Sequence, residues 1–100
     1  MPKKLNESQI QAALPDIPKW ALEQGELVRN TAFVDFKQAM TFVNTVAELA
    51  ELAGHHPDID IRYNKVRLAL MTHDVGGITQ SDLSLARDID KNSQHVPPED

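Results

Sequence analysis

Apolar and polar residues alternate most regularly between positions 58 and 71 of this chain. The apolar positions are Ile59, Ile61, Tyr63, Val66, Leu68 and Leu70. A period of two residues is typical of a β-strand that buries one face. Asn64 and Lys65 interrupt the alternation, and Asn is suited to the positive φ of a tight turn. The pattern therefore predicts two strands that pair as a hairpin.

A less regular alternation lies earlier in the chain. Trp20 and Leu22 alternate with polar residues, and positions 23–26 are typical of a turn. A further strand is expected from about Leu27 to Val34, with alternate residues on opposite faces. These two segments predict a second hairpin.

Three other segments carry apolar residues at helical spacing. The first begins after Asn6, with Gln9 three residues on, and the second begins after Asp35. The third begins after Thr79, with Asp82 three residues on. These starts have the residues of helix caps, so they predict three helices. The main apolar stripe of the second helix comprises Ala39, Met40, Val43, Val46, Ala47, Ala50 and Ala53.

A second apolar line on the long helix consists of Phe42, Leu49 and Leu52. A helix that packs on one sheet needs only one apolar stripe, so this second line requires its own explanation. It is either a subunit interface or a widened core face, and the pattern alone favours neither.

The predicted order is helix, strand, strand, helix, strand, strand, helix. Hairpins separated by helices favour an antiparallel sheet covered by helices on one face. We therefore expect an α+β fold with a four-stranded antiparallel sheet and three helices on one face, in the order α-β-β-α-β-β-α. Residues 1–91 are expected to form one domain, and the polar residues 92–100 are expected to form a mobile C-terminal tail.

Composition excludes several classes of function. A net charge of -5 argues against direct nucleic-acid binding by bulk electrostatics. The absence of cysteine excludes disulfides, thiolate metal sites and a cysteine nucleophile. No stretch approaches the roughly 20 apolar residues of a membrane span, and the first residues lack the apolar run of a signal peptide. A cytoplasmic protein without membrane attachment is expected.

The residues with the clearest potential for chemistry lie between Glu51 and Asp82. Three of the four histidines fall in this stretch, at His55, His56 and His73. The adjacent pair follows Gly54 and precedes a proline, which is typical of a helix C-terminus. Histidine exchanges protons near neutral pH, and a helix C-terminus or a nearby carboxylate favours the imidazolium form.

Three interpretations of these histidines remain open on spacing alone. They can be polar capping residues without a function. They can be metal ligands, with Glu51, His55 and His73 as the set, although no paired-ligand helix motif such as H-E-x-x-H is present. They can also be general acids and bases that need no metal.

Around these histidines the chain resembles the pterin-4a-carbinolamine dehydratase family. The matching positions read Glu51-x3-His55-His56-Pro57-x5-Tyr63-x9-His73-x8-Asp82. The resemblance extends over about 70 residues, from Trp20 to Asp90, and many spaced matches are far more specific than one histidine pair. Animal members often carry Asp immediately before the pair, where this chain has Gly54.

The resemblance implies a fold, an assembly and a reaction. The fold is the α+β arrangement already expected, and the subunits form a homodimer or a homotetramer. The reaction removes water from a 4a-hydroxytetrahydropterin and gives a quinonoid dihydropterin, which recycles the tetrahydrobiopterin of aromatic amino acid hydroxylases. The family needs no cofactor and no metal.

The resemblance also implies roles for individual residues. His55 and His73 are the acid/base pair, and Glu51 orients or charges His55. His56 helps to bind the pterin. The remaining residues assigned to substrate binding are Pro57, Trp20 and Asp82, although Asp82 can equally be a cap and Trp20 a core residue. A non-catalytic role as a dimerisation or regulatory partner is the alternative, because animal members also stabilise a transcription factor.

Overall fold

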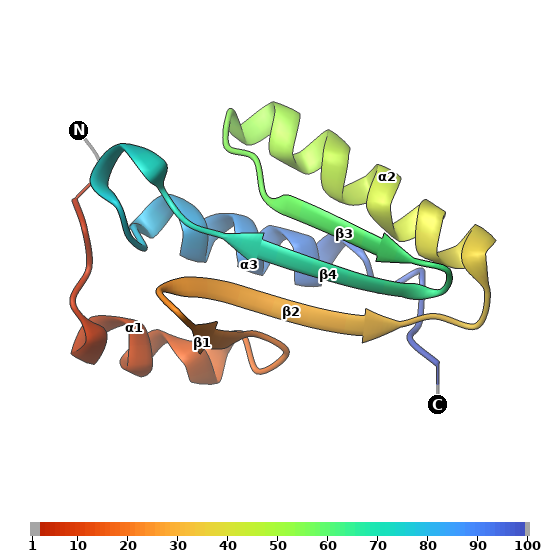
Figure 1. The fold of residues 1–100 in the computed structure, drawn as a ribbon, viewed down its shortest axis with the longest axis horizontal. Coiled ribbons are helices and arrows are strands. Elements are labelled where there is room, and N and C mark those ends of the chain that lie inside the picture. Colours follow the sequence, from red (N-terminus) through yellow and green to blue (C-terminus); the bar gives the residue numbers. More distant parts are fainter. Residues whose placement is uncertain (1–2, 100) are drawn as a thin grey trace.

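The computed structural model describes residues 3–99 (Figure 1). Its helices and strands, in chain order, are α1 (Glu7–Ala13), β1 (Ala21–Glu23), β2 (Glu26–Ala32), α2 (Phe36–Ala53), β3 (Asp58–Arg62), β4 (Lys65–Leu70) and α3 (Gln80–Asn92). Two short 3-10 helices, η1 (Leu14–Asp16) and η2 (His73–Val75), follow α1 and β4. This order confirms the predicted α-β-β-α-β-β-α arrangement.

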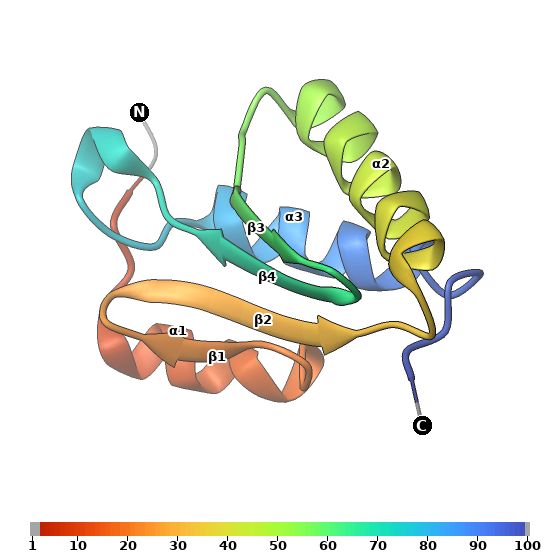
Figure 2. The same cartoon turned by 45° about the vertical axis from the view of Figure 1, so that its right-hand side comes forward.

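The four strands form one antiparallel sheet in the order β1-β2-β4-β3. Each predicted hairpin is present, and β2 joins the two hairpins by pairing with β4 from Leu27 opposite Leu70 to Ala32 opposite Lys65. Figures 1 and 2 show the helices on one side of this sheet, with α3 crossing behind the strands. The expected α+β fold is therefore confirmed.

The helices begin at the residues that the capping patterns predict. Asn6 caps α1 and Thr79 caps α3, both with a complete capping box, and the Asp35 side chain accepts from the backbone of Gln38 at the start of α2. Helix α2 ends at Gly54, whose φ of 63° is left-handed. The chain therefore leaves α2 immediately before the histidine pair, as glycine at this position favours.

The two hairpin turns differ in how closely the sequence predicted them. In the first, Gln24 and Gly25 both have positive φ, which matches a two-residue turn of the primed type. In the second, the turn residues are Tyr63 and Asn64, and the positive φ of 55° belongs to Tyr63. The expectation that Asn64 takes this conformation was wrong, because the Asn64 side chain instead donates a hydrogen bond to the Phe33 carbonyl at 2.7 Å.

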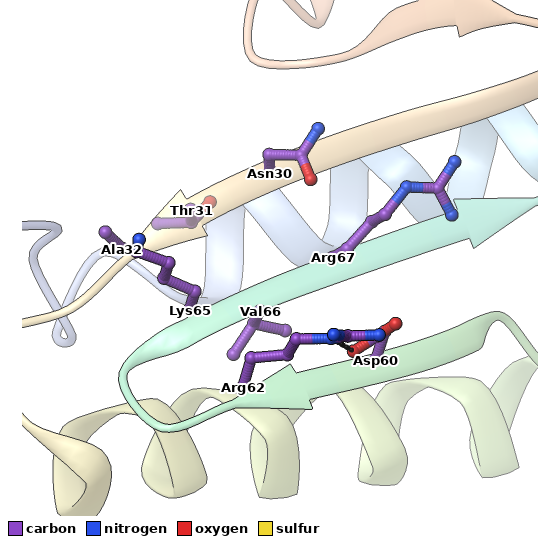
Figure 3. A pocket seen from close by; sticks show the side chains of 8 residues that line it. All are labelled: Asn30, Thr31, Ala32, Asp60, Arg62, Lys65, Val66 and Arg67. Carbon is purple, nitrogen blue, oxygen red and sulfur yellow. Dashed lines mark hydrogen bonds and ion pairs between the residues drawn. The ribbon is translucent and has the colours of Figure 1, made fainter.

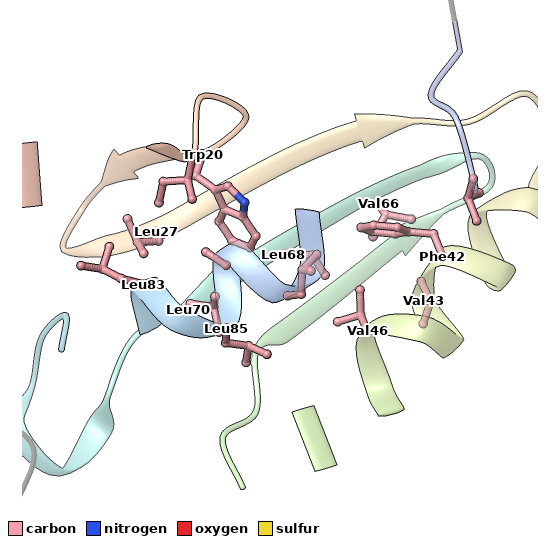
Figure 4. Close-up of a cluster of buried hydrophobic side chains, with 14 of the residues drawn as sticks. Trp20, Leu27, Phe42, Val43, Val46, Val66, Leu68, Leu70, Leu83 and Leu85 are labelled. Carbon is pink, nitrogen blue, oxygen red and sulfur yellow. The ribbon is translucent and has the colours of Figure 1, made fainter. Parts of the chain in front are cut away.

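The core lies between the sheet and the helices (Figure 4). Leu27 on β2 and Leu68 and Leu70 on β4 point into it, as their period of two predicts. Trp20 is also buried there, and its indole Nε1 donates to the Asp90 carboxylate of α3 at 2.9 Å. The core therefore fixes α3 under the strands, which sets the position of its N-terminus.

The second apolar line of α2 divides into three different environments. Phe42 is fully buried, with its ring centroid 4.9 Å from that of Phe33, so its interpretation as part of a subunit interface was wrong. Leu49 is partly buried against the core, and only Leu52, at 86% exposure, faces solvent. Phe42 follows Ala39 by three residues and precedes Val46 by four, so helical spacing places it on the buried stripe.

Arg29 is buried on the helix-facing side of the sheet, where it is 3% exposed. Its guanidinium lies 2.8 Å from the Asp90 carboxylate and 4.8 Å above the centroid of the Phe42 ring. Burial lowers the pKa of Arg29, while the charge of Asp90 and its hydrogen bond raise it. Arg29 is therefore a buried positive charge, and the Asp90 carboxylate compensates it.

The segment after α3 contacts the rest of the domain. Val96 is buried in the core, and the backbone N–H of Glu99 donates to the Ala32 carbonyl at 2.7 Å, beside the free part of the β2 edge. The mobility expected for residues 92–100 stays a prediction, and Asp100 lies outside the described residues. Within residues 3–99, no helix is long and apolar enough to cross a membrane.

Candidate functional site

The predicted histidines gather around one hollow of about 230 Å³ where the end of α2 meets the end of β4. Its lining residues are Gly54, His55, His56, Met71, Thr72, His73 and Asp74. Two segments that are distant in sequence thus bring all three candidate histidines together. A larger hollow elsewhere on the molecule has a different chemical character.

That larger hollow, of about 340 Å³, lies on the face of the sheet that the helices leave open (Figure 3). Its ionisable side chains are Asp60, Arg62, Lys65 and Arg67. Asp60 already accepts from Arg62 Nε at 3.1 Å. The lining contains no histidine, so it offers no group that ordinarily exchanges protons near neutral pH. We therefore treat the histidine hollow as the candidate active site.

His55 is held by a carboxylate from another element. Its Nε2 lies 2.5 Å from Oδ1 of Asp82, in the first turn of α3. His55 is 17% exposed and Asp82 is fully buried. Because a carboxylate accepts hydrogen bonds, Nε2 carries the proton in this contact, and Nδ1 is the ring nitrogen left for exchange with a substrate.

Asp82 is itself fixed by two donors on its second oxygen. The backbone N–H of Thr79 and the hydroxyl of Thr72 each donate to Oδ2 at 2.8 Å. The bond from Thr79 belongs to the capping box of α3, where the helix N-terminus favours a negative charge. One oxygen of Asp82 therefore caps α3, which is one of the two roles that the sequence left open, and the other oxygen contacts His55. A role of Asp82 in substrate binding stays a prediction.

Glu51 contacts a different histidine from the one expected. Its Oε2 lies 2.6 Å from His56 Nε2, and both side chains are exposed, at 77% and 63%. The expectation that Glu51 orients His55 was wrong, because Gly54 ends the helix before His55 and turns that residue toward Asp82. An exposed pair of this kind contributes about 0–1 kcal/mol to stability.

His73 lies on the exposed loop that follows β4 and begins η2. The base of this loop is closed by a bridge in which the backbone N–H of Thr72 donates to the Gly77 carbonyl at 2.8 Å. Gly76 has a φ of 65°, which allows the chain to reverse there. The loop therefore presents His73 beside the hollow from a fixed base.

Besides Glu51 and Asp82, two further predicted binding residues lie outside the lining of the hollow. Pro57 follows His56 and leads into β3, and Trp20 is in the core (Figure 4). Their assignment to substrate binding stays a prediction.

Sequence reasoning gave no site role to Thr72, although a signal was present. Thr72 continues the period of two set by Leu68 and Leu70, which places a polar side chain on the buried face beside His73.

The described side chains do not form the metal site considered from the sequence. Within residues 3–99, no three His, Asp or Glu side chains are grouped closely enough to hold a metal ion. Glu51, His55 and His73 are therefore not a ligand set in this geometry. The arrangement offers proton transfer instead, from one anchored and one exposed histidine.

Comparison with known proteins identifies a family. Residues 3–92 match the family model described as pterin 4 alpha carbinolamine dehydratase. A provisionally named pterin-4-alpha-carbinolamine dehydratase of Acidobacterium capsulatum is 56% identical over 87 residues, which cover 87% of this chain and 95% of the relative. One of Chloroflexus aurantiacus is 55% identical over 88 residues, which cover 88% and 95%.

Two solved structures share the fold. The crystal structure of a transcriptional coactivator/pterin dehydratase from Brucella melitensis has a TM-score of 0.85 and 32% identity, covering 89% of this chain and 97% of that one. A pterin dehydratase-like protein described as a RuBisCO assembly factor in the alpha-carboxysome has a TM-score of 0.62 and 21% identity, covering 75% and 87%. The second likeness shows the fold alone.

Proposed function

The chain belongs to the pterin 4 alpha carbinolamine dehydratase family, and we propose that it removes water from a 4a-hydroxytetrahydropterin by histidine acid/base catalysis. The observation that carries this proposal is the pairing at one hollow of His55, anchored to buried Asp82, with exposed His73. The proposed setting is the recycling of tetrahydrobiopterin in the cytoplasm, because this substrate forms when a pterin-dependent hydroxylase has used its cofactor.

The reaction needs one proton delivered and one removed. The C4a–O bond breaks as a proton reaches the departing hydroxyl, which leaves as water. The proton on N5 is removed, and its bonding electrons form the C4a=N5 double bond of the quinonoid dihydropterin. His55, through Nδ1, and His73 supply the acid and the base between them. Each such group typically accelerates a reaction by about 10²–10⁴-fold.

The remaining predicted residues are proposed to bind the substrate or to support the site, and not to react. His56 and Glu51 form an exposed pair at the rim of the hollow, where they can position the polar edge of a pterin. Asp82 orients His55 and keeps its proton on Nε2. Pro57 holds the chain after the histidine pair, and Trp20 supports α3 from the core.

We also propose that the protein is a homodimer or a homotetramer that associates through β3. Every residue of β3 is exposed, and the strand forms one edge of the sheet. Ile59 and Ile61 project from this edge on the face of Val66 and Leu68, yet each keeps 37% of its surface in solvent. An uncovered edge with apolar side chains is suited to pairing with a second copy.

A non-catalytic role as a binding partner is the second candidate. It is favoured by the name of the structural neighbour that is 32% identical, a transcriptional coactivator/pterin dehydratase. On this chain the open sheet face, with Arg62, Lys65 and Arg67, is the surface such a partner would meet. This role does not require the histidines.

One experiment separates the two candidates. A 4a-hydroxytetrahydropterin is generated enzymatically in a stopped-flow cell, and its loss is followed with and without the purified protein. The dehydratase proposal expects a rate proportional to protein concentration. A rate equal to that of the uncatalysed reaction at every protein concentration would leave only the binding role.

A further inference from the structure

We propose that Thr72 is a positioning residue that supports both histidines of the candidate active site, His55 through its hydroxyl and His73 through its backbone. This inference rests on the dehydratase function proposed above. Thr72 is 7% exposed and lies two residues after Leu70, the last residue of β4. Its side chain contacts the carboxylate that holds His55, and its backbone closes the loop that carries His73.

The hydroxyl of Thr72 has only one direction in which to donate. It lies 2.8 Å from Asp82 Oδ2 and 2.8 Å from the hydroxyl of Thr79. A carboxylate can only accept, so the single proton of Thr72 is used on Asp82. The hydroxyl of Thr79 must therefore donate to Thr72.

The result is a chain of hydrogen bonds that begins at the N-terminus of α3 and ends at the Asp82 carboxylate, which His55 meets from the other side. The backbone N–H of Ser81 donates to the hydroxyl of Thr79 at 3.2 Å, Thr79 donates to Thr72, and Thr72 donates to Asp82. His55 donates to the other oxygen of the same carboxylate. Hydrogen bonds in series polarise one another, and Thr72, Thr79 and Asp82 are all buried, so water does not compete for their polar atoms.

The backbone of Thr72 fixes the second histidine independently of the hydroxyl. Its N–H donates to the Gly77 carbonyl at 2.8 Å, and its carbonyl accepts from Val75 at 3.2 Å and from Gly77 at 3.3 Å. These bonds close the turn that carries His73. A substitution that keeps the β-branched shape and removes only the hydroxyl should therefore disturb His55 and spare His73.

Thr72→Val is that substitution. It leaves Asp82 Oδ2 with one donor and leaves the Thr79 hydroxyl buried without its acceptor. We expect kcat to fall roughly tenfold, the effect of one hydrogen bond to a charged group, with KM little changed. Thr72→Ser keeps the hydroxyl and should restore most of the activity. Thr45→Val is the matched control, because it makes the same change at a threonine whose hydroxyl donates to the Thr41 backbone carbonyl, at 3.1 Å within α2, and not to a site residue.

A double-mutant cycle tests whether Thr72 acts through His55. If it does, Thr72→Val should lower kcat in the wild type and have no further effect in a His55→Ala background. The same cycle with His73→Ala should show the full effect of Thr72→Val in both backgrounds. Should Thr72→Val not fold, Thr72→Ala, which leaves space for a water molecule, takes its place in both cycles.

A measurement on the protein alone separates this inference from the proposed function. A ¹⁵N–¹H spectrum of the histidine rings is expected to show His55 with its proton on Nε2, and this signal should broaden or vanish in Thr72→Val and persist in Thr72→Ser and Thr45→Val. An inactive wild type with this spectral pattern would overturn the dehydratase proposal and leave the positioning role of Thr72 intact. An unchanged His55 signal in Thr72→Val, or equal losses in the Val and Ser variants, would overturn the inference itself.

Discussion

His55 and Asp82 are joined by a 2.5 Å hydrogen bond although 27 residues separate them in the chain. The bond links the residue that follows the C-terminus of α2 to the first turn of α3. It also distinguishes the two ring nitrogens of His55, since Asp82 occupies Nε2 and the proposed proton transfer would use Nδ1. An anchored imidazole of this kind has a fixed tautomer and a fixed orientation, which proton transfer requires.

Asp82→Asn tests this anchoring. The amide removes the charge and can present a donor to His55, so we expect kcat to fall at least roughly tenfold and the free energy of unfolding to fall by about 1–3 kcal/mol. Steady-state kinetics and urea denaturation measure the two effects. Asp88→Asn, an exposed change on the same helix, is the control. An Asp82→Asn protein with wild-type kcat would show that the carboxylate serves only the helix cap.

The two histidines proposed as acid and base should differ in their effect on stability. His55→Ala and His73→Ala are each expected to lower kcat by roughly 10²-fold or more, because each removes one acid or base. Only His55→Ala should also lower the free energy of unfolding, because it leaves one oxygen of buried Asp82 without its donor. His73 is exposed on its loop, so His73→Ala should unfold at the wild-type urea concentration. Equal destabilisation by both variants would contradict this difference.

His56→Ala should act on binding more than on chemistry. His56 and Glu51 are exposed at the rim, so a contact with the pterin there is made in the ground state and the transition state alike. We expect KM to rise while kcat changes little, and Glu51→Gln should show the same trend in a smaller degree. His95→Ala, which changes an exposed histidine after α3, should leave both constants unchanged. A large loss of kcat in His56→Ala would place it with the acid/base pair.

Asp90→Ala should be among the most destabilising single changes in the core. It leaves the Arg29 guanidinium buried without its partner, and breaking a buried pair in this way costs about 3–5 kcal/mol. It also removes the acceptor for the indole of Trp20. Thermal and urea unfolding measure the loss, with Asp88→Ala as the exposed control.

The pH dependence of this loss follows from the pKa of Arg29, which burial lowers relative to the unfolded chain. The unfolded state then binds more protons than the folded state only at strongly alkaline pH, and stability rises with pH only there. Below that range Arg29 is charged in both states. The deficit of Asp90→Ala should therefore be the same at pH 7 and pH 9, and a deficit that shrinks between them would mean that Arg29 loses its proton near neutrality.

The proposed assembly is tested by a substitution on β3, and a substitution on α2 is the control. Ile61→Glu should reduce a dimer or tetramer to smaller species, because it places a charge on the exposed sheet edge. Leu52→Glu, at the most exposed apolar residue of α2, is the matched control for the helix surface. Phe42→Glu is expected to unfold the subunit, since Phe42 is fully buried. Light scattering coupled to gel filtration decides between the surfaces, and a monomeric wild type would contradict the proposal.

The fold was largely predictable because its signals are local. Each helix begins at a cap that can be recognised within four residues, as at Thr79 and Asp82, and each strand has its own period of two. The two hairpins can share one buried face only if they join into one sheet, and β2 joins them by pairing with β4. Tyr63 was missed as the positive-φ residue because the side chain of Asn64 is recruited by Phe33, a contact outside the hairpin.

The candidate site was predictable in its histidines and less so in their partners. Glu51 and His55 are four residues apart, but that spacing brings side chains together only inside a continuous helix, and Gly54 ends α2 between them. The true partner of His55 lies on α3, at a separation that no local rule covers. Thr72 was overlooked for the same reason, since its importance arises from contacts with Thr79 and Asp82.

Histidine acid/base catalysis is tested by the rate at which the protein dehydrates a freshly generated 4a-hydroxytetrahydropterin. This rate is compared among the wild type, the two single alanine variants of His55 and His73, and the double variant. We predict clear catalysis by the wild type, a loss of roughly 10²-fold or more in each single variant, and a rate close to the uncatalysed reaction in the double variant. A double variant that is folded, as judged by circular dichroism, and that turns over the substrate at the wild-type rate would contradict histidine catalysis.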